Sequence, residues 1–391
     1  MKILLAQQNY HIGNISYNTS KIITAIEHAK SAQASLVVFS ELAVCGYPPK
    51  DLLEHQHVIE ACNLAIQEIA NHTTDIHVLL GAPHLSNDSA GTKRLFNSAY
   101  HLHNGTIQQI IHKTLLPTYD IFDEARYFNV GTKNQCIEIE GVKFAVTICE
   151  DIWNIQNHKY DTQPLDELVK EQPDCIINLS ASPFDFKQAN NRLQTLLANT
   201  KKYHLPIIYC NVIGAQTDLI FDGGSLYMDA NGLIVAQANS FEEAYLFIDT
   251  ATTSVTTQAA QPTDNAIASI HQALILGIRD YFSKMGFKNA LIASSGGIDS
   301  AVVVALACAA LGSDKVHTLL LPSPFSSSHS VTDAIALAKN LNCSHDIIAI
   351  DSIYNGFETS LASAFEGLPF SVAEENLQSR IRGSLVMAYA N

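Results

Sequence analysis

The chain has 391 residues, of which 47% are hydrophobic and 16% are charged, and its formal net charge is −15. This composition is typical of folded domains with sizeable cores, and it excludes a disordered chain. The acidic balance, with no run rich in Lys or Arg, excludes a broad nucleic-acid-binding surface. The length predicts two or three domains.

The N-terminal segment MKILLAQQNYHIG soon becomes polar and lacks a signal-peptide core. No apolar run approaches the ~20 residues that a membrane-spanning helix needs. The eight cysteines occur singly, with no C-x-x-C pair, and Cys175, Cys210 and Cys308 lie in apolar runs typical of a core. We therefore expect reduced cysteines and a cytoplasmic protein.

The N-terminal part, residues 1–248, alternates short apolar strands with helical stretches. Residues 18–32 are predicted to form a helix, and Asn104-Gly105 between two β-rich runs predicts a hairpin. The runs KFAVTIC, DCIINLS and PIIYCNV are apolar throughout, as expected where both faces of a sheet are covered. Polar residues recur where these strands end, which is where layered α/β proteins place their sites.

A change of composition follows the N-terminal part. Residues 249–264, DTATTSVTTQAAQPTD, are predicted to form a linker. A second α/β alternation then predicts a doubly wound parallel α/β domain over residues 265–391. Its predicted helices cover 266–286, 299–311 and 330–341, and its predicted strands lie within 289–294, 315–322 and 345–351.

Three polar residues stand at the ends of apolar runs, namely Glu41, Lys113 and Cys149. A thiol becomes a good nucleophile when a base or a cation favours its thiolate. A carboxylate can take the thiol proton, and an ammonium can stabilise an oxyanion, so together they would suffice for acyl transfer from an amide. Spacing alone leaves an alternative open, in which Cys149 is a core residue and the other two are solvated strand ends.

The segments around these residues are FSELAVCGYPPKDLL, HKTLLPTYDIFDEARYF and ICEDIW. In this order they resemble the signature blocks of the nitrilase superfamily, and specifically of the glutaminase domain of NAD⁺ synthetases. The resemblance implies an α-β-β-α sandwich, with Glu41 as general base, Lys113 stabilising the oxyanion and Cys149 as nucleophile. It also implies that Glu124 supports the lysine.

The same resemblance implies which residues contact glutamine. Tyr119 and Glu150 match family positions, as does Ser182 in the SASP segment. Lys187 corresponds to a basic residue that follows this serine, although SASPFDFK lacks the glycine that commonly precedes it. For Tyr119 a loop aromatic packed on the sheet is the alternative.

The segment NALIASSGGIDSAVV predicts a strand, a glycine-containing loop and a helix. Loop amides and a helix N-terminus bind phosphates well, and Asp299 could hold Mg²⁺. An ordinary turn with Asp299 or Ser300 as helix cap is the alternative. SGGIDS resembles the pyrophosphate loop of the N-type ATP pyrophosphatases, which implies an ATP-binding loop of Ser294, Ser295, Gly296, Gly297, Ile298, Asp299 and Ser300.

Two later segments resemble blocks of glutamine-dependent NAD⁺ synthetases. LLLPSPFSSSHSVTDA implies an ATP contact at Leu321, and EENLQSRIRG implies that Arg380 lies near deamido-NAD⁺. A helix-surface arginine is the alternative for Arg380. Because the family pattern continues beyond Asn391, we expect a chain that is incomplete at its C-terminal side.

The resemblance as a whole implies glutamine-dependent NAD⁺ synthesis. Its substrates would be glutamine, ATP and deamido-NAD⁺, its cofactor would be Mg²⁺, and the protein would be a homo-oligomer. An amidase without synthetase activity is one alternative. A nucleotide-binding scaffold without either activity is another, and the intact Glu41, Lys113 and Cys149 argue against it.

Overall fold

The structure is a computed structural model that describes residues 1–86, 95–132, 134–157, 159–216, 218–250, 266–366, 369 and 371–391. It divides into two compact units, Met1–Ala273 and Leu274–Asn391. Within the described ranges, no helix has the length and apolar character that crossing a membrane requires. The predicted linker, 249–264, lies outside the described residues from position 251 onward, so its boundaries stay predictions.

The first unit contains two six-stranded mixed sheets. The strand order of one is β14-β1-β2-β3-β4-β5 and that of the other is β13-β12-β9-β8-β7-β6. The strands of the first sheet are β1 (Lys2–Gln7), β2 (Leu36–Val38), β3 (His77–Leu85), β4 (Leu95–His103), β5 (Thr106–His112) and β14 (Ala244–Asp249). Those of the second are β6 (Ile137–Ile139), β7 (Val142–Ile148), β8 (Cys175–Ser180), β9 (Ile207–Asn211), β12 (Leu226–Met228) and β13 (Ile234–Gln237).

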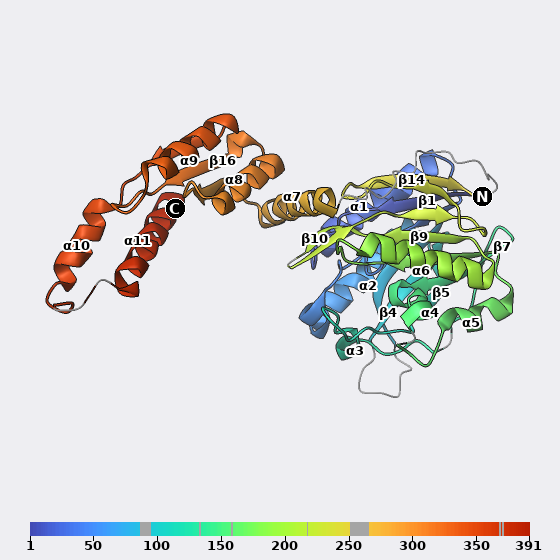
Figure 1. Cartoon of the computed structure of the whole chain (residues 1–391). Coiled ribbons are helices and arrows are strands. Elements are labelled where there is room, and N and C mark those ends of the chain that lie inside the picture. The colour runs from blue at the N-terminus through green and yellow to red at the C-terminus, as the bar shows by residue number, and fades with distance from the viewer. Residues whose placement is uncertain are drawn as a thin grey trace. The chain divides into compact units, whose positions relative to one another are not determined.

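Helices cover the outer faces of both sheets (Figure 1). The first sheet packs against α1 (Ile15–Ser31) and α2 (Gln56–Asn71), and the second against α5 (Pro164–Leu168) and α6 (Gln188–Tyr203). A separate core lies between the sheets, where Leu5 and Leu79 belong to one cluster with Phe144 and Ile177. Because successive strand residues point to opposite faces, each apolar strand contributes side chains to two hydrophobic cores. The predicted α-β-β-α sandwich is confirmed.

The turn between β4 and β5 agrees with the hairpin predicted from the sequence. Asn104 and Gly105 both have positive φ angles, 48° and 78°, in the tight turn between β4 and β5. This is the conformation that Asn-Gly favours in hairpins, so the predicted hairpin is confirmed. A second hairpin pairs β10 (Ile213–Gln216) with β11 (Leu219–Asp222).

The second unit is built on a parallel sheet of β15 (Ala290–Ala293), β16 (Val316–Leu320) and β17 (Ser344–Ile347). The helix α7 (Ala266–Met285) spans the boundary between the units. One apolar cluster joins the sheet to α8 (Ile298–Leu311) and α9 (Ser328–Asn340). Another joins it to α10 (Asp351–Leu361) and α11 (Val372–Ala390), so helices lie on both faces and the α/β class is confirmed.

The predicted strand at 345–351 is too long at its C-terminal end. The strand β17 ends at Ile347, and Asp351 already begins α10. The neighbouring strand β16 ends at Leu320, and Pro322 has no N–H with which to continue the ladder. An apolar run alone did not reveal where this partner strand stops.

Candidate active site

Strand ends in the first unit bring together the three residues of the predicted amidase site. Glu41 follows β2, Lys113 follows β5, and Cys149 opens a short 3-10 helix, η2 (Cys149–Ile152), directly after β7. The Lys113 Nζ atom lies 2.6 Å from Glu41 Oε1 and 2.7 Å from Oε1 of Glu124, which begins α3 (Glu124–Tyr127). All four side chains are buried.

Lys113 is a completely buried cation held between two carboxylates. Burial alone would lower the pKa of Lys113, but Glu124 and Glu41 raise it well above its usual range. Burial raises the pKa of Glu124 to about 7, against the opposing attraction of Lys113. Lys113 therefore keeps its charge at neutral pH in a position where an isolated ammonium would be strongly disfavoured.

Cys149 has a φ angle of 42°, in the left-handed region that a non-glycine residue seldom occupies. Such strained backbone persists only where the surrounding fold imposes it, and it is common at functional residues. Burial raises the pKa of the Cys149 thiol well above its usual range, and the negative charge of Glu41 raises it further. The resting thiol is therefore protonated, and a nearby base must take its proton before it can attack.

Asp151, which the sequence did not single out, links the segment after Lys113 to the strand that ends before Cys149. Its Oδ1 accepts hydrogen bonds from the backbone N–H groups of Thr114 (3.0 Å) and Leu115 (2.8 Å), and its Oδ2 accepts one from Ile148 (3.0 Å). These amides follow Lys113 and precede Cys149. Its place in the ICEDIW segment was the only sequence signal for this role.

Three further groups bind the paired carboxylates. The side-chain amide of Asn97 donates to Glu41 Oε1 at 2.7 Å and to Glu124 Oε2 at 3.4 Å. The Tyr47 hydroxyl donates to Glu124 at 2.8 Å, and the backbone N–H of Ala181 donates to Glu41 at 3.1 Å. The polar Asn97 in β4, a largely buried strand, had no role in the sequence analysis.

Of the four predicted glutamine contacts, Tyr119 and Glu150 bond each other, whereas Ser182 and Lys187 make separate contacts. The Tyr119 hydroxyl donates to both carboxylate oxygens of Glu150, at 2.9 and 3.1 Å, so Tyr119 is more than a packed loop aromatic. Ser182 is buried, and its N–H donates to Asn211 Oδ1. Lys187 is exposed, with its ammonium 5.1 Å from the Phe186 ring centroid. Between described residues, no contact shown joins Lys187 to Cys149, Glu150 or Tyr119.

The SGGIDS loop connects β15 to α8 in the second unit. Gly296 has a φ angle of 80°, and a Cβ atom there would lie only 2.1 Å from the Ser330 carbonyl oxygen. The position therefore requires glycine. The Ser300 hydroxyl accepts a hydrogen bond from the Ser295 N–H and donates one to the Gly297 carbonyl. Gly297 is the N-cap, so the alternative with Asp299 or Ser300 as cap is wrong.

A cavity of about 170 Å³ lies beside this loop. Ser294, Ser295 and Leu321 line it together with Arg382, whose Nε donates to the Leu321 carbonyl at 3.0 Å. Arg380 is exposed on α11. The sequence analysis named Arg380 for deamido-NAD⁺, which stays a prediction, and gave no role to Arg382 in the same RIR triplet. Arginines two positions apart on a helix point in different directions, so the motif alone did not select the one that reaches this cavity.

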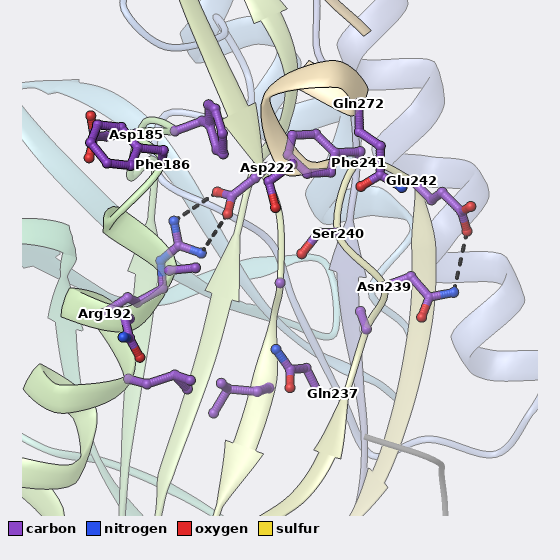
Figure 2. A pocket seen from close by; sticks show the side chains of 18 of the residues that line it. Asp185, Phe186, Arg192, Asp222, Gln237, Asn239, Ser240, Phe241, Glu242 and Gln272 are labelled. Atoms are coloured by element: carbon purple, nitrogen blue, oxygen red, sulfur yellow. Dashed lines mark hydrogen bonds and ion pairs between the residues drawn. The ribbon is translucent and has the colours of Figure 1, made fainter. Parts of the chain in front are cut away.

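A larger cavity, of about 380 Å³, lies beside α6 in the first unit (Figure 2). Arg192 and Asp222 point toward each other on its wall, with Arg192 Nη2 2.8 Å from Asp222 Oδ1. The described residues that line this cavity include none of the residues predicted for catalysis. Its two buried charges neutralise each other, so we assign no chemistry to it.

Models of two families match the chain. The carbon-nitrogen hydrolase model matches residues 2–261, and the NAD synthase model matches residues 270–391. A solved structure of an amidase from Nesterenkonia sp. shares the fold of the first part, with a TM-score of 0.55 at 20% identity over 64% of this chain and 89% of that chain. An amidase that works without a synthetase domain is therefore not favoured, because the second model covers the C-terminal part.

Full-length relatives carry both parts. The glutamine-dependent NAD(+) synthetase of Synechocystis sp. is 42% identical over 100% of this chain and 72% of the relative, and that of Acinetobacter baylyi is 36% identical over 100% and 70%. The structure of the Acinetobacter baumannii glutamine-dependent NAD+ synthetase in complex with ADP has a TM-score of 0.91 at 36% identity, over 100% of this chain and 72% of that one. With both domain models matched in order and relatives similar along its whole length, the chain belongs to the glutamine-dependent NAD⁺ synthetases.

Proposed function

We propose that Cys149, Glu41 and Lys113 release ammonia from the side-chain amide of glutamine. The observation that carries this proposal is the buried Lys113 ammonium, 2.6 and 2.7 Å from two carboxylates, beside a cysteine with a strained backbone. A preorganised cation that is shielded from water stabilises the negative oxygen that forms during acyl transfer. The electrostatic interaction of Glu41 with the Cys149 thiol supports a role of Glu41 as its base.

In the first step Glu41 takes the thiol proton and the Cys149 sulfur attacks the carboxamide carbon. Lys113 stabilises the oxyanion of the tetrahedral intermediate. The proton held by Glu41 passes to the amide nitrogen, ammonia leaves, and a glutamyl thioester remains on Cys149. Glu41 then takes a proton from water, which attacks the thioester, and glutamate is released with the thiol restored.

Glu124 and Asn97 act as positioning residues in this scheme. Glu124 binds the same Lys113 ammonium as Glu41, and Asn97 donates hydrogen bonds to both carboxylates. Asn97 thereby fixes the carboxylate that must accept a proton and the one that must stay paired with the lysine. A misplaced Glu41 would leave the proton transfer poorly aligned.

For the second unit we propose that the SGGIDS loop binds the phosphates of ATP. The backbone N–H groups of the loop, the N-terminus of α8 and the Ser295 and Ser300 hydroxyls supply donors for an anion. Arg382 and Leu321 line the adjoining cavity. The nicotinate carboxylate of deamido-NAD⁺, with Arg380 as the proposed contact, attacks the α-phosphorus and releases pyrophosphate. Ammonia then displaces AMP and forms the amide.

Asp299 can supply one of the ligands that Mg²⁺ needs. Its carboxylate is exposed in the first turn of α8, beside the proposed phosphate site. Magnesium commonly uses one or two protein carboxylates together with phosphate oxygens and water, so one aspartate is a sufficient protein contribution on this side. Bound with ATP, Mg²⁺ would offset the charge of the phosphates.

The proposed partners are small molecules, and we also propose a homo-oligomer. The eight cysteines form no disulfide, consistent with the proposed reducing, cytoplasmic compartment.

The test of the glutaminase proposal uses glutamine and an electrophile that mimics it. We expect release of glutamate and ammonia, and covalent labelling at Cys149 that glutamine prevents. Labelling at another cysteine, or hydrolysis that survives the loss of Cys149, would contradict the assignment.

A further inference from the structure

The carboxylate of Asp151 bonds two stretches of backbone that are far apart in the sequence. Its Oδ2 accepts the Ile148 N–H at the start of η2, which is a local contact of the kind that caps a helix. Its Oδ1 accepts the N–H groups of Thr114 and Leu115, which lie 37 and 36 positions earlier in the chain. Capping of η2 explains the first contact only, so the two long-range bonds indicate a further role.

The charge of Asp151 is held by these backbone groups. Asp151 is buried and takes part in none of the ion pairs between described residues. Burial raises the pKa of Asp151 to about 6, while the three bonded N–H groups and the charge of Lys113 oppose this rise. The carboxylate is therefore largely ionised at neutral pH. A buried charge without a bonded cation is unfavourable unless hydrogen bonds compensate it, and the three N–H groups supply them.

On one side, Asp151 completes the bonding of the backbone around Lys113. The Lys113 N–H donates to the Asn97 carbonyl at 2.8 Å, and the Lys113 carbonyl accepts the Gly131 N–H at 2.8 Å. Asp151 then binds the next two amides along the chain. The backbone that carries the ammonium is therefore fixed both at Lys113 and directly after it.

On the other side, Asp151 fixes the backbone that leads into the nucleophile. Ile148 directly precedes Cys149, whose φ angle of 42° lies in the left-handed region. Against the effect of burial, Lys113 lowers the pKa of the Cys149 thiol, so the two groups are close enough to interact. A single carboxylate thus connects the backbone of the cation with the backbone of the thiol.

We propose that Asp151 is a positioning residue that holds the Lys113 ammonium and the Cys149 thiol in the relative position that the reaction requires. The proposal rests on the glutaminase function above. Lys113 must meet the oxygen that becomes negative when the sulfur attacks, so a shift of either backbone misaligns the two groups. The role needs a carboxylate, because both of its oxygens accept hydrogen bonds, whereas an amide would turn its NH₂ group toward an N–H donor.

Asp151→Asn tests this role, because the amide keeps the shape of the side chain but can accept hydrogen bonds on one side only. We expect kcat for glutamine hydrolysis to fall by about 10- to 100-fold with little change in KM, since a small displacement of reacting groups has an effect of this size. Asp229→Asn is the matched control. Asp229 also accepts two backbone N–H groups, those of Asn231 and Leu233, in the turn between β12 and β13.

Asp229→Asn should keep both kcat and KM. A raised KM with unchanged kcat in Asp151→Asn would show that Asp151 affects only glutamine binding, and unchanged kinetics would show that its bonds serve folding alone. Either result, or an equal loss of kcat in the control, would overturn the proposal. Asp151→Ser, which keeps one acceptor, is measured in parallel and takes the place of Asp151→Asn if that variant does not fold.

A labelling experiment separates this inference from the proposed hydrolysis. In the chloroketone analogue of glutamine, the ketone oxygen takes the place of the amide oxygen. Glu41 takes the thiol proton, the Cys149 sulfur bonds to the chloromethyl carbon, and chloride leaves, so labelling needs no turnover. Mass spectrometry at several concentrations of the chloroketone gives the maximal labelling rate and the half-saturating concentration separately.

A maximal labelling rate lowered by about 10-fold or more in Asp151→Asn, with the half-saturating concentration unchanged, supports the inference even if the wild-type protein hydrolyses no glutamine. Equal maximal rates in the wild type and Asp151→Asn, or no labelling of Cys149 in the wild type, would overturn it even if hydrolysis by the wild-type protein is normal.

Discussion

The side-chain amide of Asn97 donates a 2.7 Å hydrogen bond to Oε1 of Glu41, the same oxygen that lies 2.6 Å from the Lys113 ammonium. Asn97 and Lys113 therefore both hold the carboxylate of Glu41, the proposed base, in position. A hydrogen bond to a charged group contributes about 1.5–3 kcal/mol. If the main role of Asn97 is to position Glu41, loss of this hydrogen bond should affect catalysis more than folding.

For Asn97→Ala we expect kcat for glutamine hydrolysis to fall by about 10- to 100-fold with little change in KM. The measurement is steady-state kinetics together with chemical denaturation. Asn18→Ala is the control, because Asn18 is also buried and bonds the carbonyls of His11 and Val44. Asn18→Ala should lose stability and keep kcat, so equal kcat losses in both variants would rule out a specific role for Asn97.

Cys149→Ala should abolish glutamine hydrolysis while the protein stays folded, because the thiol is the proposed nucleophile. Cys175→Ala and Cys210→Ala remove cysteines that are buried in the core between the sheets. These two variants should lose roughly 1–2 kcal/mol of stability and keep the chemistry. Near-normal ammonia release by Cys149→Ala would contradict the assignment of the nucleophile.

Lys113→Met leaves Glu41 and Glu124 buried without their shared cation. We expect a loss of about 3–5 kcal/mol in the free energy of unfolding, because an uncompensated buried charge is strongly unfavourable. The kcat should fall by ~10²-fold or more, because the oxyanion forms only along the reaction path. Adding Glu124→Gln should restore part of the stability and none of the activity. A double variant with recovered kcat would show that Lys113 only balances charge.

Glu124→Gln also tests the raised pKa of Glu124, which is about 7 in the folded protein. An unfolded glutamate has a pKa of about 4.3. Between these values the folded state binds more protons than the unfolded state, so this group makes stability fall as pH rises from about 4 to about 7. The free energy of unfolding of the wild type should therefore fall more steeply over this interval than that of Glu124→Gln. Parallel pH profiles would show that Glu124 is already ionised at low pH.

Gly296→Ala and Gly297→Ala form a matched pair in the SGGIDS loop. A Cβ at position 296 would lie 2.1 Å from a backbone oxygen at φ 80°, whereas one at position 297 would meet only the Ser295 hydroxyl, at 3.4 Å. Gly296→Ala should therefore destabilise the second unit and weaken ATP binding, and Gly297→Ala should keep the fold. Thermal unfolding and nucleotide titration measure both effects. Equal tolerance of the two substitutions would show that the loop relaxes around a side chain.

The sequence by itself determined the two-part organisation, most of the helices and strands, and the three strand-end residues Glu41, Lys113 and Cys149. These features depend on local patterns, because hydrophobic periodicity, Asn-Gly turns and ordered motifs are written in contiguous segments. Predicted strand 345–351 was too long for the complementary reason. Its end depends on Pro322, just after the neighbouring strand β16, and the local periodicity of residues 345–351 does not contain this information.

Only the tertiary structure decided which polar groups meet. Asn97, Tyr47 and Asp151 come from separate segments, and each bonds Glu41, Glu124 or the backbone beside Cys149. The structure also placed Arg382 at the cavity beside the SGGIDS loop and the Lys159 ammonium over the Tyr119 ring. These contacts depend on how distant segments of the chain pack together and on where their side chains point. Burial makes the contacts energetically important, because a charge far from water needs bonded partners, and no single segment supplies them.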